Sequence, residues 1–135
     1  MVKRVIQEMK KQEIGVMPGK NKLYFGEDKI LYATIVGEYT TEMAKLTYEF
    51  FELHKTKMMV DGKVKLFIDL TSARKASAGA KELMHLFSKD IGKIALIGFN
   101  PVARVIASFF IGNSTKKDIN FFNTQEDAIE WLKEE

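Results

Sequence analysis

A short polar segment beyond a predicted strand holds the side chains best suited to bind an anion. After Asp69, this segment combines hydroxyl and cationic side chains: Thr71, Ser72, Arg74, Lys75 and Ser77. Ligands of α/β proteins bind beyond the carboxyl ends of parallel strands, where helix N-termini favour anions. The segment therefore predicts a phosphate site or a hydroxyl that accepts phosphate. The alternative is that Ser77 only caps a helix and the cations are solvated.

Other patterns that could support catalysis or metal binding are missing from the sequence. There is no cysteine, which excludes disulfides and thiolate metal sites. His54 and His85 lack the further ligands, at sequence-local spacing, that a zinc site needs. The serines form no nucleophile elbow, and the glycines form neither a Walker loop nor a dinucleotide fingerprint. We therefore expect no catalytic residue, no metal and no cofactor, and a protein that is not an enzyme.

Length and charge indicate one globular domain that does not bind nucleic acid. The 135 residues include 21 basic and 18 acidic side chains, for a net charge of +3. No basic face with interleaved aromatic residues is visible, so we expect no nucleic-acid partner. Glu8 interrupts what would be a signal peptide, and the apolar run 102–111 is too short to span a bilayer. These features predict a cytoplasmic protein without a transmembrane segment.

The first 21 residues differ in character from the remainder. Glycine, proline and asparagine punctuate residues 15–21, and a short strand is expected around Ile14 to Met17. Upstream, four apolar residues recur at helical spacing beside a lysine-rich face: Val2, Val5, Ile6 and Met9. We interpret residues 1–21 as an arm of undetermined role and residues 22–135 as the domain.

The hydrophobic pattern of the domain predicts alternating strands and helices. A hairpin over 23–36 precedes a helix of about 16 to 18 residues that Thr40 or Thr41 caps and that buries Met43, Leu46, Phe50 and Leu53. Then come strand 64–70, loop 71–79, a helix from Ala80 to Ile91, strand 93–99, helix 100–111, strand 118–122 and a helix capped by Thr124. The order ββαβαβαβα predicts an α/β fold of four to five strands and four helices. Its mixed, mostly parallel sheet is opened by an antiparallel hairpin.

The predicted helix 100–111 is apolar nearly all round. Asn100 and Pro101 favour its start, and within 102–111 only Arg104 and Ser108 are polar, on one narrow stripe. Such a helix should not face water. It is either buried in the core or covered by a second subunit, a lipid or another apolar ligand. In the ligand case, Arg104 would meet the polar head.

Two motifs resemble the SpoIIAA-like family of small bacterial and archaeal proteins, within the STAS-domain fold. They are the segment from Phe99 to Ile106 (FNPVARVI) and the ending from Phe121 to Leu132 (FFNTQEDAIEWL). The resemblance covers about residues 22 to 134 and implies a non-enzymatic, cytoplasmic regulatory domain that binds a protein partner and forms a homodimer. The fold is also similar in shape to CRAL-TRIO lipid-binding domains, which implies a hydrophobic ligand as the alternative.

The same resemblance assigns a role to Ser77. In anti-sigma-factor antagonists a strand ends in Asp-Leu-Ser and the next helix opens with Asp-Ser-Ser-Gly, whose first serine is phosphorylated. Here Asp69-Leu70-Thr71 matches the first motif, and Ala76-Ser77-Ala78-Gly79 is the best match for the second, with alanines in place of the acid and the second serine. The resemblance implies that Ser77 is the phosphorylation site. The expected partner-binding residues are Asp69, Thr71, Ser72, Arg74, Ser77, Asn100 and Arg104.

Overall fold

The computed structural model describes residues 13–15, 17–111 and 118–134. Its strands are β1 (Glu13–Ile14), β2 (Lys22–Phe25), β3 (Ile30–Thr34), β4 (Gly37–Tyr39), β5 (Val64–Asp69), β6 (Ala73–Ala76), β7 (Ile91–Ile97) and β8 (Asp118–Phe122). Its helices are α2 (Thr41–Met58), α3 (Ala78–Ser88), α4 (Pro101–Ile111) and α5 (Gln125–Lys133). Among these helices, none is long and apolar enough to cross a membrane.

The main sheet has the mixed topology that the sequence predicts. Its strand order is β1-β2-β3-β5-β7-β8, with antiparallel pairing from β1 to β3 and parallel pairing from there to β8. The strand count exceeds the prediction because two short segments pair outside this sheet. β4 and β6 form a separate parallel pair. The expected strand near Ile14 is β1, which pairs with β2.

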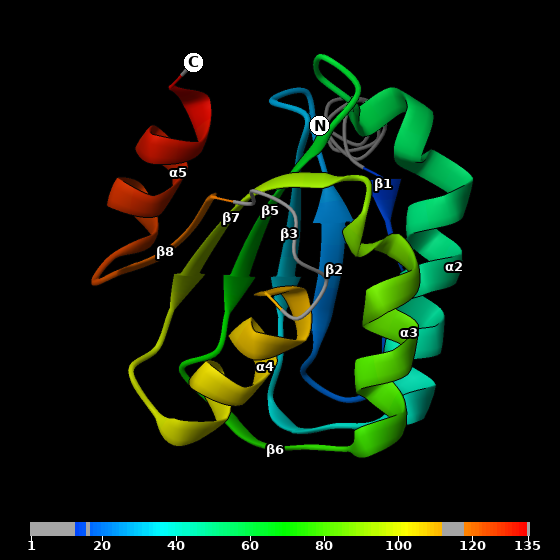
Figure 1. The fold of residues 1–135 in the computed structure, drawn as a ribbon, viewed down its shortest axis with the longest axis vertical. Coiled ribbons are helices and arrows are strands. Elements are labelled where there is room, and N and C mark those ends of the chain that lie inside the picture. Colours follow the sequence, from blue (N-terminus) through cyan, green and yellow to red (C-terminus); the bar gives the residue numbers. More distant parts are fainter. Residues whose placement is uncertain (1–12, 16, 112–117, 135) are drawn as a thin grey trace, which may run out of the picture.

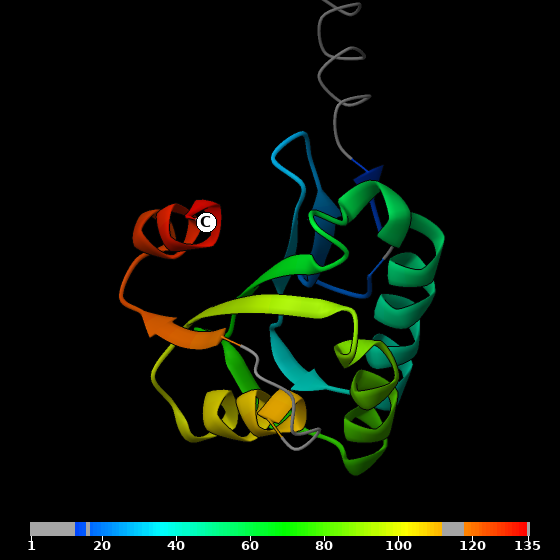
Figure 2. The same ribbon diagram turned by 45° about the horizontal axis from the view of Figure 1, so that its top comes forward.

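Helices cover the two faces of the sheet unequally. α2, α3 and α4 lie on one face, and α5 lies on the other (Figure 1). Figure 2 shows α4 and α5 on opposite sides of β7 and β8. The larger core lies under the three helices and includes Leu31, Leu66, Ile68, Ile94 and Leu96. A smaller core under α5 is formed by Ile30, Tyr32, Phe67, Ala95, Ala128 and Leu132.

Helix α2 begins where the sequence places it. The Thr40 side chain accepts a hydrogen bond from the Met43 amide at 3.1 Å, which satisfies a donor left free at the helix start. The predicted apolar stripe is wrong at one position, since Leu53 is 76% exposed while Phe51 is fully buried. Met43 and Phe50 are buried as predicted, and the buried face also includes Thr47, Phe51 and Met58.

A buried tyrosine closes the core beneath the start of α2. Tyr39 is 2% exposed. Burial raises the pKa of Tyr39 to about 12, opposed by a hydrogen bond with Thr47. The Thr47 hydroxyl in turn donates to the Met43 carbonyl at 2.8 Å. This chain of hydroxyls satisfies polar groups that would otherwise be costly to bury.

The end of β7 passes closely over the end of β5. β7 begins at Ile91, which the sequence places in the preceding helix, and the chain then turns at Gly98 with a φ of +109°. A Cβ at Gly98 would lie 2.7 Å from the Leu70 carbonyl carbon, so only glycine fits. This turn ends the strand before Phe99, which the sequence places in a buried strand but which is 70% exposed.

Candidate binding site at the carboxyl edge of the sheet

The segment after β5 is held by backbone hydrogen bonds. Asp69 turns the chain, since its Oδ1 accepts a hydrogen bond from the Thr71 amide at 3.0 Å. The Gly37 amide donates to the Ser72 carbonyl at 2.9 Å, and β6 then runs parallel to β4. The prediction of a loop over 71–79 is therefore wrong. Residues 73–76 form a strand because β4 offers them a partner.

Strand β6 presents two cations to solvent. Arg74 and Lys75 are exposed, whereas Ala73 is buried beneath the strand. Thr71 and Ser72, just before β6, are also exposed. The predicted polar residues of this segment therefore lie on the surface, where their side chains can contact a partner.

Ser77 lies between the starts of two helices. Its amide donates to the Tyr39 carbonyl at 3.0 Å, and its Oγ accepts a hydrogen bond from the Ala80 amide at 3.4 Å, at the start of α3. Its Oγ also lies 3.1 Å from Oγ1 of Thr41, the first residue of α2. A Cβ at Gly79 would collide with Thr41, so glycine allows the two helix starts to approach.

Thr41 is a site residue that the sequence analysis missed. The sequence shows two consecutive threonines at the start of α2. Thr40 provides the cap, which leaves the Thr41 hydroxyl available to Ser77. The second of the two consecutive threonines was therefore the signal in the sequence for an additional hydroxyl at this helix start. Its partner is 36 residues away, so only the fold reveals the contact.

Asn100 joins the end of β5 to the start of α4. Its Nδ2 donates to the Leu70 carbonyl at 2.9 Å, and its Oδ1 accepts from the Ala103 amide at 2.9 Å. The second bond is the predicted N-cap of α4. The side-chain amide therefore has partners within the protein on both its nitrogen and its oxygen. Its role in this structure is to position the residues around it.

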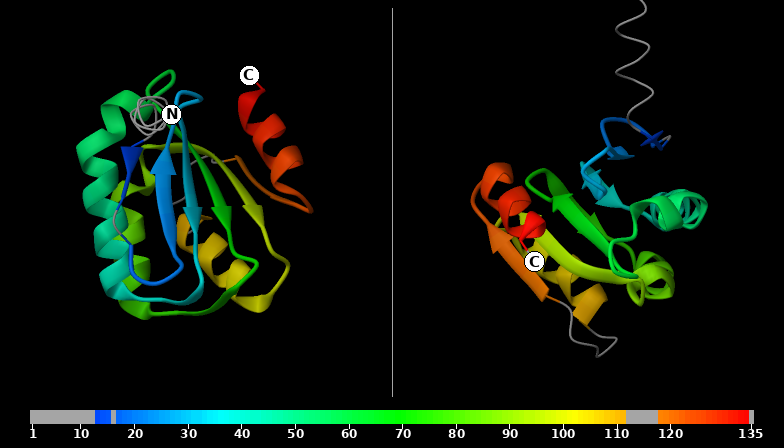
Figure 3. Two further views of the ribbon diagram at one scale, coloured as in Figure 1. Left: turned by 180° about the vertical axis from the view of Figure 1, so that it is seen from behind. Right: turned by 90° about the horizontal axis from the view of Figure 1, so that it is seen from above.

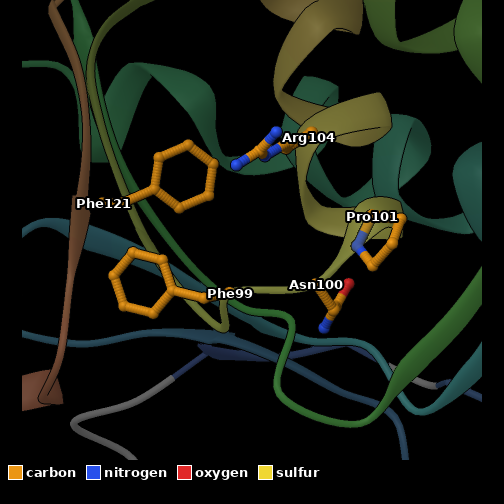
Figure 4. Close-up of a pocket in the computed structure, with 5 residues that line it drawn as sticks. All are labelled: Phe99, Asn100, Pro101, Arg104 and Phe121. Atoms are coloured by element: carbon orange, nitrogen blue, oxygen red, sulfur yellow. The ribbon is translucent and has the colours of Figure 1, made fainter.

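An open pocket of about 570 Å³ lies beside Asn100 (Figure 4). It is lined by Phe99, Asn100, Pro101, Arg104 and Phe121, and we name it the Arg104 pocket. The rings of Phe99 and Phe121 lie 5.9 Å apart at an angle of 32°. Figure 4 shows the Arg104 side chain, from α4, extending toward the side of the pocket that Phe121 occupies. Two aromatic rings and one cation suit a ligand with an apolar body and an anionic group.

Helix α4 is partly covered by the chain itself. Ala103, Ile106 and Ala107 are buried, while Val105 is 47% exposed and Arg104 and Ser108 face solvent. α4 packs against α3 and β6 on its buried side. The sequence predicts that this helix is covered on all sides. The structure covers one face of α4, and the face with Arg104, Val105 and Ser108 is exposed, where a ligand or a subunit could bind.

The predicted site residues form two groups along the carboxyl edge. Asn100 and Arg104 lie together around the Arg104 pocket, and Asn100 donates to the carbonyl of Leu70, the residue before Thr71. Ser77 lies at the other end of β6, with Thr41. Residues 13–15, 17–111 and 118–134 contain no cluster of three histidine or acidic side chains that could hold a metal ion.

Comparison with solved structures defines the class of fold. An uncharacterised protein of the DUF3478 family with a SpoIIAA-like fold, from Shewanella loihica PV-4, aligns with a TM-score of 0.53 and 23% identity, over 90% of this chain and 93% of that one. The anti-sigma factor antagonist SpoIIAA in its unphosphorylated form aligns with a TM-score of 0.61 and 11% identity, over 83% of this chain and 96% of that one. This chain therefore has the SpoIIAA-like fold that its motifs predict.

The sequence also matches a defined family. The chain belongs to the family described as "Domain of unknown function (DUF7793)", whose model matches residues 24–135. No curated protein matches the sequence. The description of this family names no activity, so the activity of the chain has to be inferred from the site.

Replacement of Asn100 tests its positioning role. We expect Asn100→Ala to lower the free energy of unfolding by about 2 kcal/mol, because it removes the cap of α4 and one of the two hydrogen bonds to the Leu70 carbonyl. Asn100→Ser keeps a capping oxygen and should lose about half as much. Urea denaturation followed by circular dichroism measures both. The exposed Asn120→Ala serves as the control, with a loss below about 0.5 kcal/mol; equal losses for Asn100→Ala and Asn120→Ala would contradict the role.

Proposed function

We propose that this chain is a cytoplasmic, non-enzymatic regulatory domain that binds a protein partner through the carboxyl edge of its sheet. The observation that carries the proposal is Phe99, a large apolar side chain that is 70% exposed beside the Arg104 pocket. Exposed aromatic and arginine side chains around a hollow are typical anchors of protein interfaces. The likeness in fold to an anti-sigma factor antagonist supports a regulatory role.

Polar side chains on the same edge of the sheet as Phe99 would complete such an interface. Thr71, Ser72 and Arg74 lie exposed along the same edge. Backbone bonds from β4 fix the segment that carries them. A partner would therefore meet an apolar centre at Phe99 and a polar, positively charged rim along β6, an arrangement that stable interfaces share.

The interface can be tested with two exposed apolar residues that differ in position. We expect Phe99→Asp to lower recovery of the partner in affinity capture from source-cell extract by tenfold or more, since it places a carboxylate at the anchor. Leu53→Asp is the matched control, because Leu53 is 76% exposed on α2, away from the carboxyl edge, and the charge change is the same. Quantitative mass spectrometry compares the captured proteins. Identical capture by the two variants would contradict the proposed interface.

Ser77 is the proposed switch of this interface. Its hydroxyl lies at the starts of both α2 and α3, so a phosphate there would add about −1.5 to −2 charges near two helix N-termini. Arg74 and Lys75 precede it on β6 and carry the charges that could pair with the phosphate. The resemblance of residues 76–79 to the phosphorylated motif supports this role.

Phosphorylation can be measured directly. We expect incubation with source-cell extract and ATP to place phosphate on Ser77, as detected by peptide mass spectrometry. Ser77→Glu should then change partner recovery about tenfold relative to Ser77→Ala, because only the glutamate mimics the added charge. Thr41→Val, which removes the hydroxyl bonded to Ser77, should keep the phosphorylation. An unmodified Ser77, together with equal recovery for Ser77→Glu and Ser77→Ala, would exclude the switch.

The Arg104 pocket favours a second candidate function, as a carrier or sensor of a small hydrophobic or lipid-like ligand. Its volume of about 570 Å³ falls in the usual range for small-molecule sites. Phe99 and Phe121 would hold an apolar body, and Arg104 would pair with an acidic head group. A homodimer is a third candidate, in which a second subunit would cover the exposed face of α4. The exposed side chain of Val105 enlarges the apolar surface of that face.

Native mass spectrometry of the freshly purified protein separates these occupants. A bound ligand would appear as extra mass that is lost on denaturation, and Arg104→Glu should remove it, since the head group loses its cation. Arg74→Glu is the control, with the same charge change on β6. A bare dimer would instead indicate that a subunit covers α4. Retention of the extra mass by Arg104→Glu would contradict a role for this pocket.

A further inference from the structure

Strand β8 is the last strand of the main sheet and has a neighbour on one side. It pairs with β7 over five residues, from Asp118 to Phe122, without a shift in register. In the part of the chain that the structure describes, no strand pairs with its other side. Figure 3 (right) shows β8 at the end of the sheet away from β1, with α5 on one side of it and α4 on the other. The outer side of β8 therefore presents a row of backbone amides and carbonyls.

The features that protect other edge strands from pairing are missing from β8. Such edges commonly carry lysine or proline, contain a bulge, or are very short. The sequence of β8, DINFF, contains no lysine or proline, and five residues is an ordinary strand length. The strand at the opposite edge, β1, has two residues. Asp118 is the one charged residue of β8 and occupies its first position. The structure therefore leaves β8 open to pairing with another strand.

Each face of β8 continues a packed layer of the domain. Ile119 and Phe121 are half-buried on the α4 side, where they pack against the larger core. Phe122 lies on the α5 side, and its ring is 5.5 Å from that of Trp131. Asn120 shares this side and is exposed. A strand added beside β8 would therefore meet apolar side chains on the α4 side and the uncharged Asn120 on the other.

We propose that β8 pairs with β8 of a second copy of this chain, so that two main sheets join across a two-fold axis. An axis perpendicular to the sheet makes this pair antiparallel, which is the more stable arrangement per residue. Every copy carries the edge already folded, so this pairing costs less conformational entropy than the ordering of a flexible peptide. The proposal uses the edge of the sheet and not the exposed face of α4, and it does not rest on the partner interface proposed above.

The alternation of side chains restricts the register of the pair. The α4 side of one copy continues into the α4 side of the other only if the axis passes through a residue, not between two residues. Among such registers, the one centred on Asn120 pairs all five residues of β8. It places Asn120 opposite its own copy and Ile119 opposite Phe121. Asp118 and Phe122 then lie opposite each other at the two ends. The apolar pairs on the α4 side are thus self-complementary, as an isologous interface requires.

The second copy would also contribute to the Arg104 pocket. Phe121 lines this pocket together with Phe99. In the register centred on Asn120, Ile119 of the second copy lies directly opposite Phe121, with about 5 Å between the Cβ atoms. The dimer would therefore have two Arg104 pockets, one on each side of the axis, and each would gain an apolar side chain from the other copy.

A charge at the axis tests the pairing. Sedimentation velocity of the purified chain measures the dissociation constant of the dimer. We expect Asn120→Asp to raise this constant about fivefold or more, because it places two carboxylates opposite each other. Asn120→Ala should stay within about twofold of the wild type, since the pairing uses backbone groups. Gln125→Glu is the matched control, with the same amide-to-carboxylate change at an exposed position of α5. Equal constants for Asn120→Asp and Gln125→Glu would overturn the proposal.

A disulfide at the axis tests the register. The sequence has no cysteine, so Asn120→Cys introduces one thiol per copy. Directly opposite residues of antiparallel strands have Cα atoms about 4.5 to 5.5 Å apart, which a disulfide can bridge. Diamide is the oxidant: two thiols lose two hydrogens to its N=N bond, and one S–S bond forms. We expect a covalent dimer, detected by intact mass spectrometry, in about tenfold higher yield than for Thr56→Cys, which is exposed on α2. Equal yields would overturn the register and the pairing with it.

The same measurements identify other occupants of the edge. A wild-type chain that stays monomeric up to its solubility limit would overturn the proposal. If this monomer captured another protein from source-cell extract and Asn120→Asp lost it, the edge would pair with a strand of that protein instead. A dimer that Val105→Asp dissociates and Asn120→Asp does not would overturn the proposal in favour of a contact over α4.

Discussion

The candidate site depends on the close crossing of two backbone segments at the carboxyl edge of the sheet. Gly98 lies so near Leu70 that no side chain fits, and the Asn100 amide then donates to the Leu70 carbonyl. These contacts set where α4 begins relative to the end of β5. Because Phe99 lies between the two contact points, it is directed outward instead of into the core. Without this crossing, neither the Arg104 pocket nor its connection to Thr71 would have its present form.

The sequence predicts what depends on local periodicity and fails where pairing is distant. The order of the main-sheet strands and the helices, a cap at Thr40 or Thr41, and the caps at Asn100 and Thr124 were predictable, because each follows from residues close together in the sequence. The SpoIIAA-like fold was predictable from that order together with the two motifs at 99–106 and 121–132. β6 was missed because its four residues, ARKA, have no apolar alternation. Its existence follows from pairing with β4, more than 30 residues earlier.

The same reasoning explains the outcome for the site residues. Asp69 and Asn100 are polar residues near a strand end, which makes them candidates, but both use their side chains to fix the backbone. Phe99 looked like a core residue from its apolar neighbours. Its exposure results from the positive φ of Gly98, a property that the residue type permits but does not require. Thr41 became part of the site only through contact with Ser77.

The two faces of the main sheet differ in what covers them. The face under α2, α3 and α4 leads to the carboxyl edge, with its pocket and its hydroxyl pair. In the part of the chain that the structure describes, the other face is covered by α5, a helix of nine residues. A parallel strand is normally covered on both sides. On the α5 side, aromatic side chains provide part of the cover of β3 and β5. Tyr24 stacks on Tyr32, and Tyr32 packs against Phe67.

The pairing of β4 with β6 has a thermodynamic consequence for recognition. A flexible surface loop would have to lose conformational entropy each time it bound a partner. The residues from Ser72 to Ser77 are already ordered, since their backbone bonds run to Gly37 and Tyr39. Association would then resemble rigid-body docking, with a small heat-capacity contribution from local folding. A modest contact area can consequently suffice for a specific complex at this edge.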